Sequence, residues 1–284
     1  MIPSNFDYVA PSTVEEAVAA LANAGEDAKV IAGGQSLMPV LRLRLAAPTV
    51  LVDLGHIGEL RGVRDDGDAL TIGSMTTYYG LLGNPLISKH ALLLADATRT
   101  VADPQIRHRG TLGGAIAHAD PAGDLCAPVL AMDATMTAVS PSGSRSIPAS
   151  EFFVDYFTTA LQPDEILTEI RVPKHTDWAA HYEKLSRIAQ AWSIVSVAAT
   201  VALDDGVISQ ARVALTNMAS VPVRAHGVEQ ALIGQPATAE SIRTAAEHAA
   251  EDTNPITDAN ADAEYRSHLA RVLTRRAVTT AIGA

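Results

Sequence analysis

KVIAGGQSL, at residues 29–37, joins an apolar run to a pair of glycines and a serine. The apolar half is typical of a buried strand, and the glycines mark the turn at which that strand ends. Because glycine permits positive φ and has no Cβ, Gly33 and Gly34 can present bare backbone N–H groups to a ligand. A turn of this kind suits a phosphate group.

The flanking residues predict that this turn belongs to a small βαβ unit. Thr13 and Glu16 have the spacing of a capping box, and apolar residues follow at helical intervals until Gly25. Residues 49–54 predict a second strand, and Pro39 suits the first turn of a short helix between the two strands. The opening third of the chain therefore predicts alternating strands and helices.

A second glycine turn, GTLGGA at residues 110–115, follows residues 106–109, which we interpret as another apolar strand. One glycine pair more often only ends a strand. Two such turns could together offer four or five charge-assisted N–H bonds of roughly 1.5–3 kcal/mol each, enough for the roughly 8 kcal/mol of micromolar binding. The pair of turns therefore favours a dinucleotide.

Two common nucleotide motifs are absent from the sequence. No two glycines lie two residues apart, which excludes the Rossmann pattern G-x-G-x-x-G. No lysine follows a glycine, which excludes the Walker A motif. A bound dinucleotide therefore requires another fold.

The composition disfavours several other classes of protein. The chain has 284 residues, enough for two or three compact units, and no apolar run of the ~18 residues that a membrane span needs. Its formal net charge of −11 disfavours nucleic-acid binding. Cys126 is the one cysteine and cannot alone hold an iron–sulfur cluster, so any cluster must belong to a partner. The first residues lack the features of a secretion signal, and we expect a cytoplasmic protein.

The rest of the chain predicts an α+β unit and then a hairpin with helices. Short strands at 60–64 and 69–73 flank a turn, and a second hairpin is predicted from 194 to 217. The intervening pattern predicts helices at 76–82, 89–101 and 124–133, strands at 135–140 and 166–172, and a mixed sheet. In the Ala-rich last 60 residues, Leu269, Val272, Leu273 and Arg276 share one helical spacing. We divide the chain into units 1–54, 55–175 and 176–284.

Several segments, taken in order, resemble one flavoprotein family. They are AGGQSL at 32–37, QIR at 105–107 leading into RGTLGG at 109–114, Asp120-Pro121 to Asp124, EIL at 165–167, and YEKL at 182–185 before Arg187. They are similar to the FAD-binding, or medium, subunit of the carbon monoxide dehydrogenase and xanthine dehydrogenase family of molybdenum hydroxylases, over essentially the whole chain. The resemblance implies an α+β fold with a PCMH-type FAD-binding region, formed by the βαβ unit and the middle sheet unit, and a C-terminal antiparallel sheet with helices that covers the flavin.

The resemblance also implies cofactors and partners. FAD would lie between the first two units and relay electrons from an iron–sulfur subunit to an external acceptor. The molybdenum cofactor and two [2Fe-2S] clusters would belong to a large and a small partner subunit, in a dimer of heterotrimers. Gln35 stands where relatives commonly have histidine, so we expect FAD to be held without a covalent bond, and Ala115 stands where they commonly have asparagine.

The same resemblance assigns the FAD-contacting positions. The two turns would wrap the pyrophosphate, and the chain around Asp124 would contact the ribityl and phosphate region. Ile166, Leu167, Lys184 and Trp192 would lie near the flavin ring. The full set is Lys29, Val30, Ile31, Ala32, Gly33, Gly34, Gln35, Ser36, Leu37, Val101, Gly110, Thr111, Gly113, Gly114, Ala117, Asp120, Asp124, Ile166, Leu167, Lys184 and Trp192. No catalytic residue and no metal ligand is assigned.

Other chemistry fits these residues less well. The nine histidines lack metal-ligand spacing, and we expect His118 to make a structural hydrogen bond. Ser36, His118 and Asp120 could be drawn as a hydrolase triad, but the G-x-S-x-G motif fails at Met38. Tyr78 and Tyr79 are expected to pack rather than to approach a cofactor.

Two alternative functions stay open: a free-standing FAD oxidase or dehydrogenase of the same fold, and a non-catalytic assembly subunit. The sequence does not identify the reducing substrate, which the resemblance leaves as carbon monoxide, a purine, nicotine or another N-heterocycle, or an aldehyde. The electron acceptor is equally open.

Overall fold

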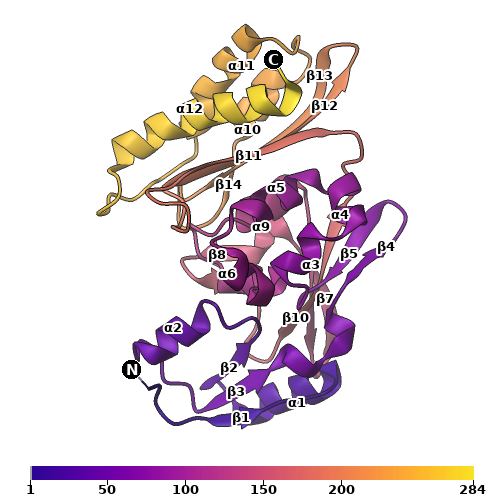
Figure 1. Cartoon of the computed structure of the whole chain (residues 1–284), viewed down its shortest axis with the longest axis vertical. Coiled ribbons are helices and arrows are strands. Elements are labelled where there is room, and N and C mark those ends of the chain that lie inside the picture. Colours follow the sequence, from indigo (N-terminus) through magenta and orange to yellow (C-terminus); the bar gives the residue numbers. More distant parts are fainter. Residues whose placement is uncertain (1) are drawn as a thin grey trace.

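The computed structural model describes residues 2–284, so Met1, the first residue of the predicted unit 1–54, lies outside the described residues. Three main sheets follow one another along the long axis of the molecule (Figure 1). The N-terminal sheet lies at one end, the five-stranded sheet in the middle, and the four-stranded sheet with the last helices at the other end. Within residues 2–284, no helix is long and apolar enough to cross a membrane.

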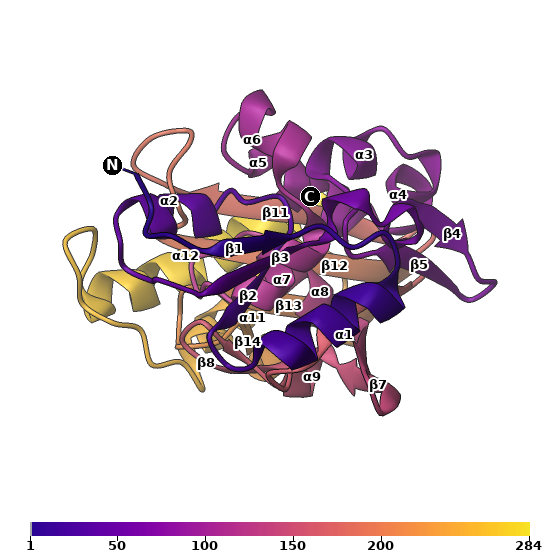
Figure 2. The ribbon, with the colours of Figure 1, turned by 90° about the horizontal axis from the view of Figure 1, so that it is seen from below.

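The N-terminal sheet is parallel and has the order β1-β3-β2. Its strands are β1 (Asp7–Val9), β2 (Ala28–Ile31) and β3 (Val50–Asp53), and its helices are α1 (Val14–Ala24) and α2 (Leu37–Arg42). Figure 2 shows this unit from below, with the two helices on opposite sides of the strands. The Thr13 hydroxyl accepts from the N–H of Glu16, which confirms the predicted start of α1. The sequence analysis missed only β1.

The middle sheet has the order β4-β5-β10-β6-β7. Its strands are β4 (Val63–Asp65), β5 (Ala69–Gly73), β6 (Thr135–Ser140), β7 (Gly143–Pro148) and β10 (Ile166–Pro173). Every neighbouring pair in it is antiparallel, so the predicted mixed sheet was wrong. Two of these pairs are tight hairpins, which can only join antiparallel strands. The α+β class itself is confirmed.

Short helices pack against the middle sheet and fill its core. They are α3 (Tyr78–Leu82), α4 (Pro85–His90), α5 (Leu92–Thr100), α6 (Pro104–Arg109), α7 (Leu112–His118), α8 (Cys126–Ala131) and α9 (Ala149–Phe152), and a two-stranded ribbon, β8 (Phe153–Asp155) and β9 (Thr158–Thr159), follows them. The predicted helix 89–101 is in fact two helices that break at Ala91. Residues 106–109, predicted as a strand, form the end of α6, so the second glycine turn joins two helices.

The C-terminal sheet has the order β11-β12-β13-β14 and is antiparallel. Its strands are β11 (Ala179–Leu185), β12 (Val195–Asp204), β13 (Val207–Thr216) and β14 (Val223–Arg224), and its helices are α10 (His226–Leu232), α11 (Ala239–Ala246) and α12 (Ala263–Ile282). The predicted hairpin is confirmed. Leu269 and Leu273 are buried as their spacing predicts, but Arg276 is exposed, because the buried face of α12 continues instead through Ala277.

Candidate functional site

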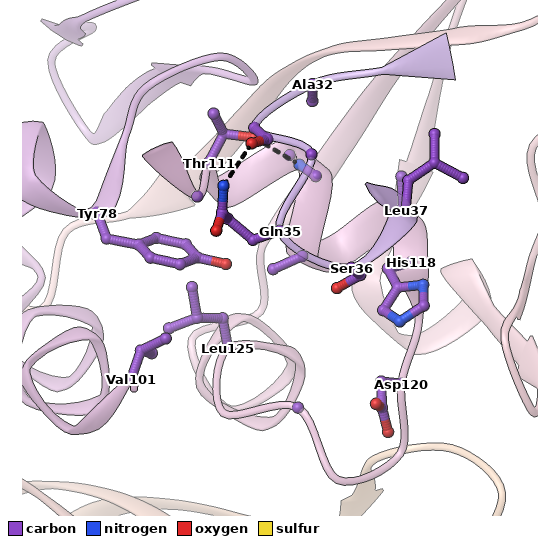
Figure 3. A pocket seen from close by; sticks show the side chains of 18 of the residues that line it. Ala32, Gln35, Ser36, Leu37, Tyr78, Val101, Thr111, His118, Asp120 and Leu125 are labelled. Carbon is purple, nitrogen blue, oxygen red and sulfur yellow. Dashed lines mark hydrogen bonds between the residues drawn. The ribbon is translucent and has the colours of Figure 1, made fainter. Parts of the chain in front are cut away.

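A cavity of about 700 Å³ lies where the N-terminal unit, the middle unit and the loop before β12 meet. Both glycine turns line it, as Figure 3 shows from close by. Of the positions expected to contact FAD, all except Ile31 and Lys184 line this cavity. Segments far apart in the sequence therefore come together in one place.

The first turn leads from β2 into α2. Gly34 has φ +74°, which an L side chain rarely adopts. No hydrogen bond within residues 2–284 occupies the backbone N–H groups of residues 33–36. The Gln35 side chain folds back on its own turn, where its Nε2 donates to the Gly33 carbonyl at 2.9 Å. The first turn thus presents its main-chain donors at the cavity, as the sequence predicted.

The second turn presents fewer bare donors than predicted, because among residues 110–115 only the N–H of Thr111 has no hydrogen-bond partner within residues 2–284. The N–H groups of Leu112 and Gly113 donate to the carbonyls of Thr76 and Ser74 at 3.0 and 2.9 Å. The N–H of Gly114 donates to the Thr111 hydroxyl at 3.1 Å, since Thr111 caps α7. A turn that opens a helix can satisfy its own donors in this way. Most donors of this segment therefore hold the local fold and are not free for a ligand.

The glycines of the second turn instead permit close approach. A Cβ on Gly113 would lie 2.4 Å from the Cβ of Ser74, and a Cβ on Gly110 would lie 2.5 Å from the Tyr78 ring. A Cβ on Gly33, in the first turn, would lie 2.2 Å from the carbonyl oxygen of Arg109. The two turns are therefore packed backbone against backbone at Gly33, while Gly110 and Gly113 make room for Tyr78 and Ser74 of the middle unit.

The segment after α7 supplies another wall of the cavity. Figure 3 shows the side chains of His118 and Asp120 projecting from it toward the cavity. The Asp120 carboxylate accepts from the N–H of Ala122 at 2.9 Å. Across the described part of the chain, the backbone N–H groups of Asp124 and Leu125 make no hydrogen bond. They are a second set of main-chain donors. The sequence did not show whether this segment would contact a ligand through its backbone or through its side chains.

The His118 side chain makes no hydrogen bond to any of residues 2–284, so the expected structural hydrogen bond was wrong. Its ring lies 5.2 Å from the ring of Phe157, and burial lowers the pKa of its imidazole below the ordinary value. Nothing in the described chain joins it by a hydrogen bond to Ser36 or Asp120. The triad drawn from the sequence therefore lacks the contacts that a nucleophile and its base need.

Both tyrosines were expected to pack in the core: Tyr78 does so and also lines the cavity, whereas Tyr79 does neither. The Tyr78 ring is buried against Gly110, and Figure 3 shows its hydroxyl directed into the cavity. Burial raises the pKa of this hydroxyl, which finds no hydrogen-bond partner among residues 2–284. Tyr79 is exposed and stacks on His108 with ring centroids 4.0 Å apart. Helical periodicity could not separate these two adjacent tyrosines.

Lys184 lies behind the cavity wall and contacts Asp124, not the cavity. Its Nζ is 2.7 Å from the Asp124 carboxylate, which also accepts from the hydroxyls of Tyr182 at 2.9 Å and Ser193 at 2.8 Å. Both side chains of the ion pair are almost fully buried. Burial raises the pKa of the Asp124 carboxyl, and the ammonium of Lys184 opposes that rise. The Asp124 carboxylate therefore joins the cavity wall to the C-terminal sheet.

Two further segments complete the lining. Ile166 and Leu167, at the start of β10, give it an apolar side. Gln190, Ala191 and Trp192 reach it from the loop between β11 and β12, and the Gln190 amide donates to the Asp103 carboxylate at 3.2 Å. Trp192 is 56% exposed, so its ring lies at the mouth of the cavity.

Within residues 2–284, no group of three or more His, Cys, Asp and Glu side chains could hold a metal ion. Cys126 lines the cavity wall as a buried free cysteine, and burial raises the pKa of its thiol. The unoccupied N–H groups of residues 33–36 and the apolar side at Ile166 and Leu167 suit the cavity to an organic ligand with an anionic part.

Two family models match the chain. Residues 4–175 match the FAD binding domain in molybdopterin dehydrogenase, and residues 180–281 match the CO dehydrogenase flavoprotein C-terminal domain. The carbon monoxide dehydrogenase medium chain of Hydrogenophaga pseudoflava is 40% identical over 284 residues, covering 99% of this chain and 98% of that one. The caffeine dehydrogenase subunit beta of a Pseudomonas species is 35% identical and covers 99% and 96%.

Solved structures show the same fold over the whole length. Carbon monoxide dehydrogenase from Hydrogenophaga pseudoflava, in a form that lacks the Mo-pyranopterin moiety of its cofactor, matches with a TM-score of 0.97 and 40% identity, covering 100% of this chain and 99% of the matched chain. Quinoline 2-oxidoreductase from Pseudomonas putida 86 matches with a TM-score of 0.95 and 31% identity, with the same coverage.

Proposed function

Because the chain belongs to the family of FAD-binding medium subunits of molybdenum hydroxylases, we propose that its cavity holds one FAD, without a covalent bond, between units 1–54 and 55–175. Unit 176–284 would cover part of the flavin through its loop at residues 190–192. The observation that carries this assignment is the row of unoccupied N–H groups at residues 33–36 beside the cavity. In a chain of net charge −11, such local donors are what a pyrophosphate requires.

The cavity passes a physical test of fit for this cofactor. Its volume of about 700 Å³ is within the range of about 300–1,000 Å³ found for cofactor pockets. Donors come from two places, residues 33–36 and the N–H groups of Asp124 and Leu125, and together they match the number that a micromolar site needs. The sequence had indicated the glycine turn at Gly113 and Gly114 as the second set of donors, and the structure leads us to propose Asp124 and Leu125 instead.

Each part of the lining then has a role toward FAD. The first turn binds the pyrophosphate through its main chain, and the Ser36 hydroxyl adds a side-chain donor at the same place. Tyr78 offers its free hydroxyl to a polar atom of the ligand. Ile166, Leu167 and Trp192 supply apolar surface for the ring system and exclude water from it. Asp124 and Lys184 act from behind, because they hold the wall in place.

The proposed reaction is electron relay within a larger complex. FAD supplies the ability to take electrons singly and to release them in pairs. The iron–sulfur clusters must lie in another chain, since Cys126 is the one cysteine here. We propose a large molybdenum-cofactor subunit and a small subunit with two [2Fe-2S] clusters as partners, in a dimer of heterotrimers. The names of the relatives support a multi-subunit enzyme.

The test is to purify the complex that contains this chain from its native host. We expect about one FAD per chain, released intact by acid, with molybdenum and iron in the co-purifying subunits. A complex without flavin would contradict the proposal and favour the assembly subunit, whereas substrate turnover by the chain alone would favour the free-standing oxidase. Cell fractionation tests the expected cytoplasmic location, and assays with carbon monoxide, purines, N-heterocycles and aldehydes address the substrate.

A further inference from the structure

The loop at residues 186–194, which joins β11 to β12, carries one wall of the cavity on an exposed tip. Residues 187–190 are exposed, and Gln190 to Trp192 line the cavity. Within residues 2–284, the one side-chain hydrogen bond that ties the tip to another segment is that from Gln190 to Asp103, and this bond is itself exposed. The root of the loop is different, because Ser193 is only 2% exposed. The position of the tip therefore depends on how the root is held.

Asn217, the residue after β13, holds that root. Its Nδ2 donates to the carbonyl of Ser193 at 2.8 Å and to that of Ile194 at 3.2 Å. Its own backbone N–H donates to the carbonyl of Pro121 at 2.8 Å. Pro121 lies in the segment that contains Asp120 and Asp124, the opposite wall of the cavity. Asn217 thus connects the two cavity walls, in addition to the direct bond from the Ser193 hydroxyl to the Asp124 carboxylate at 2.8 Å.

Two observations indicate that this junction is a built feature. Asn217 has φ +63°, a left-handed conformation that asparagine and glycine adopt most easily. The guanidinium of Arg266, on α12, is fully buried and donates to the same Ile194 carbonyl. A second Arg266 nitrogen pairs with Asp258 at 2.8 Å. A buried arginine at this point requires a definite acceptor, and the loop root supplies it.

We infer that Asn217 is a positioning residue that clamps the loop at 186–194 to the Pro121 segment and thereby slows the release of FAD. The inference rests on the proposed function, because it takes the cavity to hold FAD. Asn217 does not line the cavity and acts only through the two segments that it joins. Without its side chain, the Ser193 carbonyl loses a donor, and the root is held by the Ser193 hydroxyl on Asp124 and by Arg266 on the Ile194 carbonyl.

Two substitutions separate the side chain from the backbone conformation. Asn217→Gly keeps the left-handed backbone and the bond to Pro121 but removes both bonds to the loop. Asn217→Asp keeps the shape of the side chain but places a carboxylate oxygen against two carbonyl oxygens. It should therefore accelerate FAD release more than Asn217→Gly does. The matched control is Asp205→Gly, because Asp205 also has positive φ, at +45°, in the exposed turn between β12 and β13.

The experiment measures FAD release from the purified complex by the rise in flavin fluorescence, together with hydrogen exchange. We expect release from Asn217→Gly to be about tenfold faster than from the wild type, the loss that one buried hydrogen bond predicts. Exchange should increase in residues 119–124 and 186–194 but not along β12 and β13, whereas a general structural defect would affect the hairpin as well. Asp205→Gly should match the wild type in both measurements.

The possible failures are distinguishable. If the wild-type complex contains FAD but both Asn217 variants release it at the wild-type rate, the clamp is refuted and the proposed function stands. If the wild-type complex contains no FAD, the proposed function itself fails. If Asn217→Asp does not assemble, the milder Asn217→Gly supplies the comparison. A uniform rise in exchange across the C-terminal sheet would also overturn the clamp.

Discussion

Replacing Gly33 with alanine tests the contact between the two glycine turns. The new Cβ would lie 2.2 Å from the Arg109 carbonyl oxygen and 2.8 Å from the Gly110 Cα. Ordinary contacts of this kind are about 3.5 Å or longer, and both obstacles are backbone, so the turns must separate by about 1 Å. Overpacking of this size costs about 1–3 kcal/mol. Since separation moves the first-turn donors away from the cavity, we expect FAD affinity to fall by a factor of about 5–150.

The assay measures two quantities for the variant and for the wild type. They are the FAD dissociation constant of the complex and its thermal midpoint of unfolding in the absence of added FAD. Gly58→Ala is the control, because no atom lies within 4 Å of its new Cβ and its φ is not in the left-handed region. The control should bind FAD as the wild type does. Wild-type affinity in Gly33→Ala would refute the reasoning, since the turns would then tolerate the added methyl group. A lower midpoint with unchanged affinity would show that the contact stabilises the fold but not the site.

Three further changes test other parts of the structure. Tyr78→Phe removes the hydroxyl that enters the cavity, so titration should show FAD affinity about two- to tenfold lower with an unchanged thermal midpoint; an unchanged affinity would remove Tyr78 from the site. Thr111→Val removes the cap of α7 and should lower the free energy of unfolding by about 1 kcal/mol in denaturant titration, while Thr100→Val on the end of α5 should cost less. Burial lowers the pKa of His175 from 6.5 to about 4, so between these pH values unfolding takes up a proton. The free energy of unfolding should therefore fall as the pH drops from about 6.5 to about 4, and His175→Gln should make that fall shallower. An identical pH profile of stability in the variant would contradict the assignment.

The elements with strong local signals were predictable from the sequence. Thr13 caps α1 as its spacing with Glu16 indicates, and the Asp-Gly turns place both hairpins correctly. Local patterns did not reveal how strands that are distant in sequence pair. The middle sheet was predicted as mixed because the direction of β10 depends on its neighbours β5 and β6, which lie about a hundred and about thirty residues away in the chain.

The site shows the same division between local and long-range information. The first turn was predictable because an apolar strand and two glycines carry the signal in nine residues. The second turn was misread because Ile106 and its neighbours are apolar and basic residues in an order that suits a strand. The Asp103 side chain instead caps the N-terminus of a helix that contains them. The role of Lys184 toward Asp124 and the entry of Tyr78 into the cavity depend on packing between distant segments, and no spacing in the sequence encodes them.

The Asp124 cluster also limits how a gene of this kind can be recombined. The two family models divide between residues 175 and 180, yet Asp124 is on one side of that division and Lys184 and Ser193 are on the other. A hybrid that joined these halves from unrelated ancestors would bury a carboxylate without a matching cation, at a cost of about 3–5 kcal/mol. That is a large fraction of the stability of a natural domain. We therefore expect a hybrid with a crossover between residues 175 and 180 to fold stably only when both parents carry the same buried pair.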